Sequence, residues 1–441
     1  MAAEAPPFTV EPAARAVLET LWSAGHAGYL VGGGVRDALL GLRSSDWDVT
    51  TDARPERILQ IFPGSSYQNR YGTVLARGTE ITTFRRDHRY ADHRRPDSVT
   101  FSTDVFEDLA RRDLTINAIA WGRGGPDAAS RLVDPADGRG DLEAGLVRAV
   151  GDPDRRFDED ALRLLRAVRI AARLDFTIEP MTRAAMVAHA GDIEWVSEER
   201  VGTEVRRMLS SATPSRAFRL MLDMGILVAT LPELAALADD DASPAGDFDR
   251  TLASLDAAHA AEPDNELLAL AALLAEIGPE SARLVLDRLR VSARDSESVC
   301  ALVAAATDAY LTSWSDAEVR RYMGRVRPER LDELLALRRA RVAGDDPALA
   351  QEVELAERIA AQRAADPPLT LAELAIDGRD LRETLGLPEG PAIGMILERL
   401  LADVIEEPAL NTRVTLLTRA SLILDQLVQQ GRGGADTAAI R

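Results

Sequence analysis

Residues 30–51 read "LVGGGVRDALLGLRSSDWDVTT", a run of glycines followed by two carboxylates, Asp46 and Asp48, one residue apart. The segment "WDVTT" has the β-branched and aromatic residues of a strand, in which residues two apart lie on the same face. We therefore expect Asp46 and Asp48 to point the same way, and two such charges repel unless a cation lies between them. Because Mg²⁺ prefers oxygen ligands and leaves positions for phosphate oxygens, the pair predicts a magnesium site.

The glycine run is the second part of this pattern. Gly32, Gly33 and Gly34 allow a sharp turn and a close approach to a ligand, and Arg36 adds a charged fork that suits phosphate. The stretch is not a Walker loop, because no Gly-Lys-Ser/Thr follows, and Asp37 stands where a dinucleotide fingerprint needs glycine or alanine. The pattern predicts a triphosphate held by the glycines beside metal held by the aspartates. The alternative is a tight turn beside a surface Asp-x-Asp.

A third carboxylate is a candidate for the same site. In "TEITTF", an alternating strand pattern, Glu80 shares a face with Thr82 and Phe84. A neighbouring strand could bring Glu80 beside the aspartate pair as a further catalytic group, and the alternative is an ordinary acid on the solvent face of a strand.

The composition bounds the class of protein. A length of 441 residues predicts two to four domains, and the formal net charge of −20, with arginine but no lysine, argues against a general nucleic-acid coat. Cys300 is the only cysteine, which excludes an internal disulfide and a cysteine metal cluster. The first residues do not form a signal-peptide pattern, and no apolar run reaches the ~18 residues of a membrane helix. We expect a cytoplasmic protein that does not contact a membrane.

The character of the sequence changes along the chain. Strand-like runs with turn signals occupy roughly the first 150 residues, whereas from Phe157 onward Leu, Ala, Arg and Glu recur at helical spacing. A break at 364–370, "AADPPLT", precedes a last helical block. The sequence predicts a mixed α/β head followed by helical modules.

Several motifs occur in an order that identifies a family resemblance. They are "LVGGGVRDALLGLRSSDWDVTT" (30–51), "TFRRDHRYADHRRPDSVTF" (83–101), "RRDLTINAIAW" (111–121), "FDEDALRLLRAVRIAARL" (157–174) and, near the end, "IDGRDLRETLGLPEGPAIGMILERLLADVIEEPALN" (376–411). Together they resemble the class II tRNA nucleotidyltransferases, the CCA-adding enzymes, which share their head with bacterial poly(A) polymerases. The middle of the chain, about 215–355, matches this family weakly.

The resemblance implies a fold and an activity. The fold would be an α/β nucleotidyltransferase head of the polymerase-β-like type, followed by an all-helical neck, body and tail. The expected divisions are 1–150 for the catalytic head, 151–213 for the neck, 214–355 for the body and 356–441 for the tail, which would bind tRNA. The reaction would add C, C and A to the 3′ end of tRNA from CTP and ATP without a template, with Mg²⁺ as cofactor and pyrophosphate as product.

The resemblance also implies roles for individual residues. By it, Gly32, Gly33 and Arg36 would contact nucleotide phosphates, and Asp46 and Asp48 would hold Mg²⁺. Arg112 would contact the nucleotide, and Asp113 and Asn117 would lie near the ribose. The base and phosphate pocket would be lined by Asp160, Arg163, Arg166 and Arg169.

The helix expected from Phe157 has a matching physical pattern. Its polar residues, Asp160, Arg163, Arg166 and Arg169, step by three and form a slanting ridge beside an apolar ridge of Leu162, Leu165 and Val168. A carboxylate only accepts hydrogen bonds and a guanidinium only donates them, so Asp160 and Arg163 together fit the pairing edges of cytosine and adenine but not those of uracil and guanine. The alternative is a surface helix with an Asp160–Arg163 ion pair.

Two other stretches refine the expected activity. The segment 84–95, "FRRDHRYADHRR", is basic and carries Tyr90, which suits a single-stranded RNA end, and in the family this loop is associated with the switch to A addition. Where many relatives carry a His-Asp metal motif in the body, this chain has "LLAEIGPES" at 273–281, so phosphohydrolase activity is not expected.

Several functions remain open at this point. The first alternative is an A-adding enzyme that needs a CC-adding partner, and the second is a poly(A) polymerase, which the short, nearly neutral end "GRGGADTAAIR" disfavours. A non-catalytic RNA-binding protein is disfavoured by the intact Asp46 and Asp48. The oligomeric state, including a homodimer, is left open, as are the body and tail residues that would contact tRNA.

Overall fold

The computed structural model describes residues 8–44, 46–69, 72–88, 98–238, 247–326, 328–342 and 347–431. Residues 89–97, which hold most of the basic loop, lie outside the described residues. The chain forms two compact units, one of Met1–Phe248 with Val285–Val291 and the other of Asp249–Leu284 with Ser292–Arg441. The expected division into head, neck, body and tail therefore stays a prediction.

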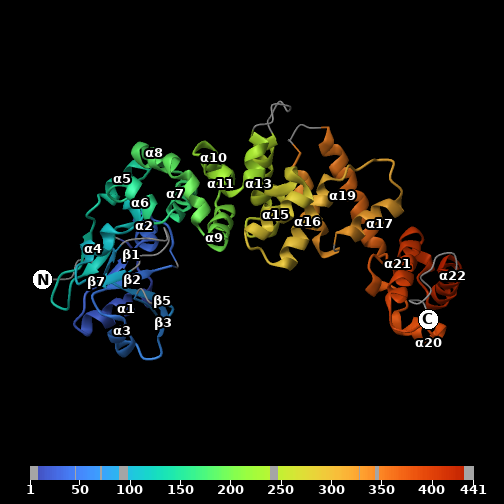
Figure 1. Ribbon diagram of the computed structural model, residues 1–441, viewed down its shortest axis with the longest axis horizontal. Helices are drawn as coiled ribbons and strands as arrows, with labels where there is room; N and C mark the ends of the chain where they lie inside the picture. The colour runs from blue at the N-terminus through green and yellow to red at the C-terminus, as the bar shows by residue number, and fades with distance from the viewer. Residues whose placement is uncertain are drawn as a thin grey trace. The chain divides into compact units, whose positions relative to one another are not determined.

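A mixed sheet forms the centre of the first unit (Figure 1). Its strands, in the described part of the chain, lie in the order β3 (Ser66–Asn69), β4 (Thr73–Ala76), β5 (Thr79–Thr83), β2 (Asp48–Thr51), β1 (Gly28–Val31), β8 (Ala120–Arg123) and β9 (Arg131–Val133). β2 and β5 run parallel, and the other neighbours are antiparallel. Since β2 lies between β1 and β5, the end of β1 that leads into the glycine run lies beside the start of β2 that carries Asp48.

Short helices surround this sheet. They are α1 (Pro12–Ser23), α2 (Gly33–Leu39), α3 (Pro55–Ile61), α4 (Val105–Ala110), α5 (Gly138–Ala144) and the 3₁₀ turn η1 (Thr115–Asn117). A separate ribbon pairs β6 (Arg85–His88) with β7 (Ser98–Phe101). The buried side chains of Tyr29, Phe84 and Leu109 belong to one apolar cluster, which fixes β1 against α4. The α/β head expected from the sequence is confirmed.

Helices follow the head within the first unit (Figure 1). They are α6 (Pro153–Glu159), α7 (Leu162–Leu174), α8 (Pro180–Ala188), η2 (Ala190–Trp195), α9 (Glu198–Leu209), α10 (Pro214–Asp223), α11 (Ile226–Thr230), α12 (Pro232–Ala235) and η3 (Ala236–Ala238), with β10 (Leu146–Val147) paired to β11 (Thr177–Ile178). α7 packs against α9 and α10. Gly202 of α9 allows a close approach, because an added Cβ would lie 2.2 Å from the carbonyl oxygen of Leu289.

The prediction of one continuous helix from Phe157 was wrong. α6 ends at Glu159, and Asp160 has extended backbone angles (φ −158°, ψ 103°) before α7 starts at Leu162. The side chain of Asp160 accepts a hydrogen bond from the backbone N–H of Leu162, an interaction typical of helix starts. The predicted apolar ridge of α7 is confirmed, because Leu162, Leu165 and Val168 are all buried.

The second unit is helical. Its main helices are α14 (Glu266–Leu274), α16 (Ala293–Thr307), α17 (Asp316–Arg325), α18 (Leu331–Ala340), α19 (Ala348–Ala365), α20 (Gly378–Leu385), α21 (Pro391–Glu406) and α22 (Arg413–Gly431), with 3₁₀ turns η4 (Ala275–Ile277), η5 (Pro328–Arg330), η6 (Leu371–Glu373) and η7 (Pro408–Leu410). Two helices, α13 (Asp247–Ala261) and α15 (Gly278–Arg288), cross the boundaries between the units. None of the helices in the described ranges combines the length and the apolar character of a membrane-spanning segment.

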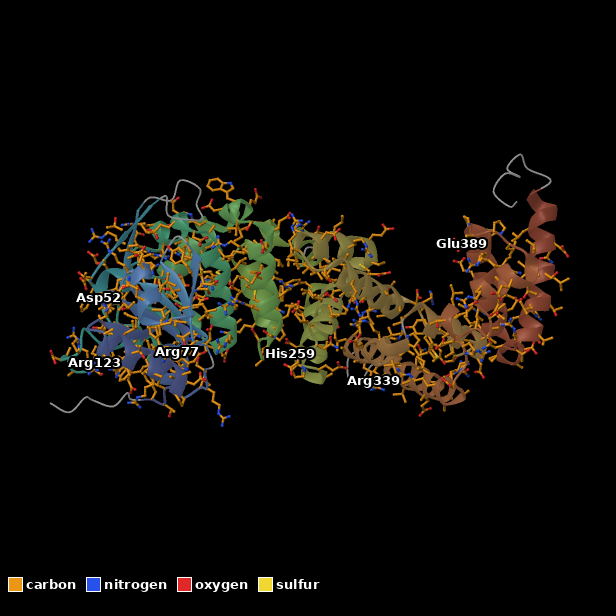
Figure 2. All side chains as sticks on the ribbon, turned by 90° about the horizontal axis from the view of Figure 1, so that it is seen from below. Asp52, Arg77, Arg123, His259, Arg339 and Glu389 are labelled. Carbon is orange, nitrogen blue, oxygen red and sulfur yellow. The ribbon has the colours of Figure 1, made fainter. Side chains whose placement is uncertain are left out.

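The stretch 273–281, where relatives carry a His-Asp motif, covers the end of α14, η4 and the start of α15. His259 of α13, labelled in Figure 2, is buried with 9% of its surface exposed. Over the described ranges no group of three or more His, Cys, Asp or Glu side chains could hold a metal ion.

Buried arginine contacts hold the second unit together. Arg338 of α18 is 5% exposed and donates to both carboxylate oxygens of Glu352 on α19, at 2.5 and 2.6 Å. It also donates to the carbonyl oxygen of Asp308 at 2.9 Å and to the hydroxyl of Tyr322 at 3.2 Å. A charge buried this deeply is tolerated because its donors are used.

We expect Arg338→Met to lower the free energy of unfolding by about 3 to 5 kcal/mol, because it leaves the carboxylate of Glu352 buried without its partner. Adding Glu352→Leu should recover part of the loss. The matched control is Arg363→Met, which breaks an ion pair with Asp332 whose side chains are 38% and 74% exposed, and should cost less than about 1 kcal/mol. Urea unfolding followed by circular dichroism measures all of these, and equal losses for Arg338→Met and Arg363→Met would contradict the buried pair.

Candidate active site

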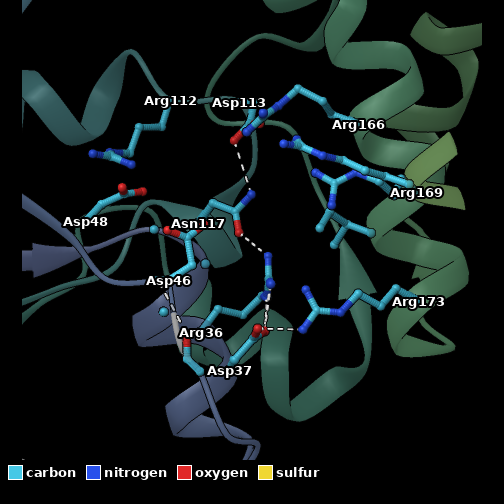
Figure 3. A pocket seen from close by; sticks show the side chains of 16 residues that line it. Arg36, Asp37, Asp46, Asp48, Arg112, Asp113, Asn117, Arg166, Arg169 and Arg173 are labelled. Carbon is cyan, nitrogen blue, oxygen red and sulfur yellow. Dashed lines mark hydrogen bonds and ion pairs between the residues drawn. The ribbon is translucent and has the colours of Figure 1, made fainter. Parts of the chain in front are cut away.

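A cavity of about 360 Å³ opens in the first unit where α2, the start of β2, η1 and α7 meet (Figure 3). Its lining includes both negatively charged aspartates and positively charged arginines. The lining residues are Gly32, Gly33, Gly34, Arg36, Asp37, Ser44, Asp46, Asp48, Arg112, Asp113, Asn117, Arg166, Arg169, Ile170, Arg173 and Arg207. The structure thus brings together all of the expected site residues except Glu80, Asp160 and Arg163.

The glycines allow α2 to start close to the carboxylates. Gly32, the residue before α2, has φ 81°, a conformation that favours glycine. An added Cβ at Gly34 would lie 2.7 Å from the carbonyl oxygen of Asp46 and 3.0 Å from the Trp47 ring. The close approach seen at Gly34 is to the protein's own chain at Asp46, and Arg36 and the aspartates line one cavity there. The predicted approach of the glycines to a ligand stays a prediction.

Asp46 and Asp48 line the same cavity, but β2 starts only at Asp48, so Asp46 precedes the strand. Between them Trp47 is buried with 6% of its surface exposed. Burial, together with the negative charges of Asp46 and Glu80, raises the pKa of Asp48 to about 6, against the lowering effect of Arg112. Such crowding of negative charge is the environment that a divalent cation would relieve.

Glu80 lies on β5, the parallel neighbour of β2. The register pairs Val49 with Ile81, and this places Glu80 level with Asp48 on the adjacent strand. A neighbouring strand therefore does bring Glu80 beside Asp48, although Glu80 is exposed and does not line the cavity. Its catalytic role stays a prediction.

Arginines form much of the rest of the cavity lining. Arg36 is 2% exposed and donates from Nε and Nη2 to one oxygen of Asp37 at 2.8 and 2.6 Å. Its Nη1 donates to the side-chain oxygen of Asn117 at 2.6 Å. The other oxygen of Asp37 accepts from Arg173 at 2.6 Å. Burial lowers the pKa of Arg36, and Arg173 and Arg169 lower it further, while Asp37 opposes this shift.

The same chain of hydrogen bonds continues to α7 (Figure 3). Asn117 donates to Asp113 at 3.3 Å, and Arg166 donates to the other oxygen of Asp113 at 2.6 Å. Burial opposes ionisation of Asp113, but the charge and hydrogen bond of Arg166 outweigh it and leave the pKa of Asp113 lowered. Arg112 lies near Asp48, and its buried Nε has no hydrogen-bond partner within the described part of the chain.

Asp160 and Arg163 lie outside the cavity lining and do not pair with each other. Asp160 accepts from Arg200 of α9 at 2.7 and 3.1 Å. Arg163 donates to Glu159 at 2.7 Å and to the carbonyl oxygen of Arg156 at 2.9 Å. The surface Asp160–Arg163 ion pair considered as an alternative is therefore not formed, and their roles in base recognition stay a prediction.

Sequence reasoning missed three charged residues of the lining, Asp37, Arg173 and Arg207. The spacing of three along the polar ridge ends at Arg169, whereas the helical repeat of 3.6 residues continues with a step of four to Arg173. In the sequence alone, Asp37 stands out only as a mismatch to a dinucleotide motif. Arg207 of α9, 58% exposed, lies 3.6 Å from Glu204, which also accepts from Arg169.

Family models match most of the chain. The poly(A) polymerase head domain matches residues 28–148, the RNA- and SrmB-binding site of polymerase A matches 175–237, and domain 2 of tRNA nucleotidyltransferases matches 261–420. The first of these spans the strands and turns that carry Asp48, Arg112 and Asn117.

Individual proteins are similar over nearly the whole length. The CCA-adding enzyme of Levilactobacillus brevis is 34% identical over 91% of this chain and 97% of its own length. That of Lactiplantibacillus plantarum is 32% identical over 94% and 96%. The solved structure of the Bacillus stearothermophilus CCA-adding enzyme in complex with CTP has a TM-score of 0.71 at 27% identity, covering 95% of this chain and all of that one.

The raised pKa of Asp48 gives a stability prediction. An acid whose pKa rises on folding, from 3.8 to about 6, destabilises the fold above pH 6, and this cost shrinks as the pH falls toward 4. At about 1.4 kcal/mol per pKa unit, Asp48→Asn should stabilise the metal-free protein by up to about 3 kcal/mol at pH 8 and by about half as much at pH 5.

Urea unfolding in the presence of a chelator measures this effect. The control is Asp127→Asn, an exposed residue between β8 and β9 that should change stability little at either pH. A loss of stability in Asp48→Asn at pH 8 would show that the carboxylate is not held in an unfavourable environment.

Proposed function

The chain belongs to the family of CCA-adding enzymes, and we propose that it adds C, C and A to the 3′ end of tRNA from CTP and ATP. The observation that carries this proposal is the cavity in which Asp46 and Asp48 face a set of arginines. A nucleoside triphosphate with a divalent cation presents both signs of charge and matches these two sides. The tRNA and CTP named for solved relatives from Thermotoga maritima and Bacillus stearothermophilus agree with these substrates.

The arginines bind the triphosphate in this proposal. Arg36, Arg112, Arg166 and Arg169 line the cavity and donate to phosphate oxygens, and Arg36 is already oriented by Asp37 and Asn117. Guanidinium groups suit phosphate because their donors form a planar fork. Since their positions are fixed before binding, little ordering is needed when the nucleotide arrives.

The metal site fits the residues present. Membership of the nucleotidyltransferase family implies dependence on a divalent metal, and we propose Mg²⁺ held by Asp46 and Asp48. Both are oxygen ligands on one side of the cavity, and Asp48 is crowded by like charge. Mg²⁺ keeps several waters and binds substrate phosphates, so two carboxylates suffice. When bound, it would stabilise charge on the transferring phosphoryl group.

The reaction is a displacement at the α-phosphorus of the nucleotide. The 3′ oxygen of tRNA forms a bond to the α-phosphorus of the nucleotide, the bond between that phosphorus and the α–β bridging oxygen breaks, and pyrophosphate leaves while the hydroxyl proton passes to solvent. The chain's contribution is to align the triphosphate for this displacement and to neutralise its charge. We assign Glu80 a smaller electrostatic role, because it is exposed beside Asp48 on the neighbouring strand.

Base choice is assigned to Asp160 and Arg163. Arg200 holds the carboxylate of Asp160, and Glu159 holds the guanidinium of Arg163. Asp160 and Arg163 both keep further hydrogen-bonding groups beyond these contacts. The carboxylate of Asp160 can accept from an amino group of the base, and the guanidinium of Arg163 can donate to a ring nitrogen. Cytosine and adenine present this combination, whereas uracil and guanine present its reverse.

The first experiment separates the functions that remain. Purified protein is incubated with tRNAs that lack CCA or end after the first or second C, with CTP or ATP alone. We expect C addition to the first two substrates and A addition to the third. Addition of A only would indicate an enzyme that needs a CC-adding partner, and long A tails would indicate a poly(A) polymerase.

The carboxylates are tested in the same assay. Asp46→Ala or Asp48→Ala should lower the rate of addition at least about a hundredfold while tRNA binding, measured by filter retention, is retained. Glu80→Ala should lose only part of the rate. Near-normal turnover in Asp48→Ala would overturn the metal assignment.

Base choice has its own test. Single-turnover addition of all four nucleotides to a tRNA lacking CCA should show Asp160→Ala or Arg163→Ala slowing CTP and ATP while rejecting UTP and GTP less strictly. Each lost buried contact is worth about 1 to 3 kcal/mol, or roughly tenfold to a hundredfold in discrimination. If both variants slowed every nucleotide by one common factor, the pair would have a structural role only.

A further inference from the structure

Two arginines of α7 reach the same side of the cavity. Arg166 and Arg173 are seven residues apart, about two helical turns, so their side chains leave α7 in similar directions. Arg166 binds Asp113 and Arg173 binds Asp37, each at 2.6 Å (Figure 3). Arg169, between them, pairs instead with Glu204 of α9 at 2.7 Å.

The two pairs are the ends of one chain of hydrogen bonds. Asp37 holds Arg36 through Nε and Nη2, Arg36 holds Asn117 through Nη1, and Asn117 reaches Asp113. The guanidinium of Arg36 is therefore fixed on both sides while it is almost fully buried. Arg36 can turn its remaining N–H groups toward a phosphate only in the orientation that Asp37 and Asn117 allow.

Asp37 itself depends on α7. Its carboxylate is 7% exposed, and its two oxygens are divided between Arg36 and Arg173. If Arg173 were removed, one oxygen of Asp37 would lose its charged partner, and the carboxylate could rotate toward Arg36 or toward the cavity. Either movement would change the direction in which Arg36 donates.

We propose that Arg173 and Asp37 are positioning residues for nucleotide binding: Arg173 holds Asp37, and Asp37 orients Arg36 toward the triphosphate. α7, which carries Arg163 for base recognition, thus also sets the direction in which Arg36 of the head donates to phosphate. It does so through a pair of residues, Arg173 and Asp37, that are 136 positions apart in the sequence. This inference rests on the proposed function, because it requires that Arg36 binds nucleotide phosphate.

A direct contact is the rival explanation. Arg173 lines the cavity and its side chain is 40% exposed, so it has room to touch a phosphate itself. The two explanations differ in how Arg173 and Asp37 combine. If Arg173 acts through Asp37, removing Arg173 from the Asp37→Asn variant should not weaken CTP binding further, because Asp37 no longer holds Arg36 there. If Arg173 contacts phosphate directly, its removal should weaken CTP binding by the same factor with or without the Asp37 carboxylate.

The experiment is a double-mutant cycle on the full chain with Mg²⁺ present. The variants are Arg173→Ala, Asp37→Asn, the double variant and Arg173→Lys. CTP affinity is measured by calorimetry, and KM and kcat are measured for addition of one C. We expect Arg173→Ala to weaken CTP binding and raise KM by about tenfold, the loss of one charge-assisted hydrogen bond, with kcat changed less than about threefold.

The double variant should bind CTP no more weakly than Asp37→Asn alone. Arg173→Lys should restore most of the affinity, because a single N–H from Arg173 makes the contact and an ammonium group can supply one. The matched control is Arg290→Ala, which removes an ion pair with Glu198 whose side chains are 65% and 50% exposed, outside the cavity, and should leave KM unchanged.

Two results would overturn the inference. Strictly multiplicative losses in the double variant would assign Arg173 to direct phosphate contact, and an unchanged KM in Arg173→Ala would remove it from nucleotide binding altogether. Thermal unfolding of every variant identifies any loss of folding, and the Arg173→Lys comparison holds even if Asp37→Asn is unstable. Failure of the unaltered protein to bind CTP would instead refute the proposed function, and this inference with it.

Discussion

Buried carboxylates of the head are tolerated because arginines of α7 pair with them. Asp37 and Asp113 are less than a tenth exposed, and an unpaired charge in such a place would be protonated or would destabilise the fold. Their partners, Arg173 and Arg166, come from one helix and hold the orientation of Arg36 and Asn117 between them. The geometry of the cavity therefore depends on how this helix lies against the head sheet.

The cavity places charged side chains in environments that do not favour their charged forms. Burial and like charges raise the pKa of Asp48, and burial with neighbouring arginines lowers the pKa of Arg36 and of Arg169. A triphosphate would stabilise the arginines, and a divalent cation would stabilise the aspartates. Local stability is given up for binding, a compromise that proteins concentrate at functional sites.

Arginine serves a different purpose in the second unit. Arg320 of α17 donates to the carbonyl oxygens of Ile405 and Glu406 at the end of α21, at 2.7 and 3.0 Å, and to Gln362 of α19 at 2.9 Å. One guanidinium thus satisfies carbonyls that a helix end leaves unpaired and joins three helices. The chain has no lysine. The guanidinium group of arginine, with its several donors, both joins helices within the second unit and lines the cavity of the first unit.

The sequence by itself determined the features that depend on local spacing. The spacing of Asp46 and Asp48 indicated that they would lie together, and both line one cavity; helical periodicity identified the buried side of α7. Only the tertiary structure decided the break at Asp160 and the parallel pairing that places Glu80 beside Asp48. It also decided the link between Arg173 and Asp37. Spacing along one strand or helix fixes which side chains share a face, whereas partners from distant segments are chosen by how the elements pack and by the cost of leaving a buried charge unpaired.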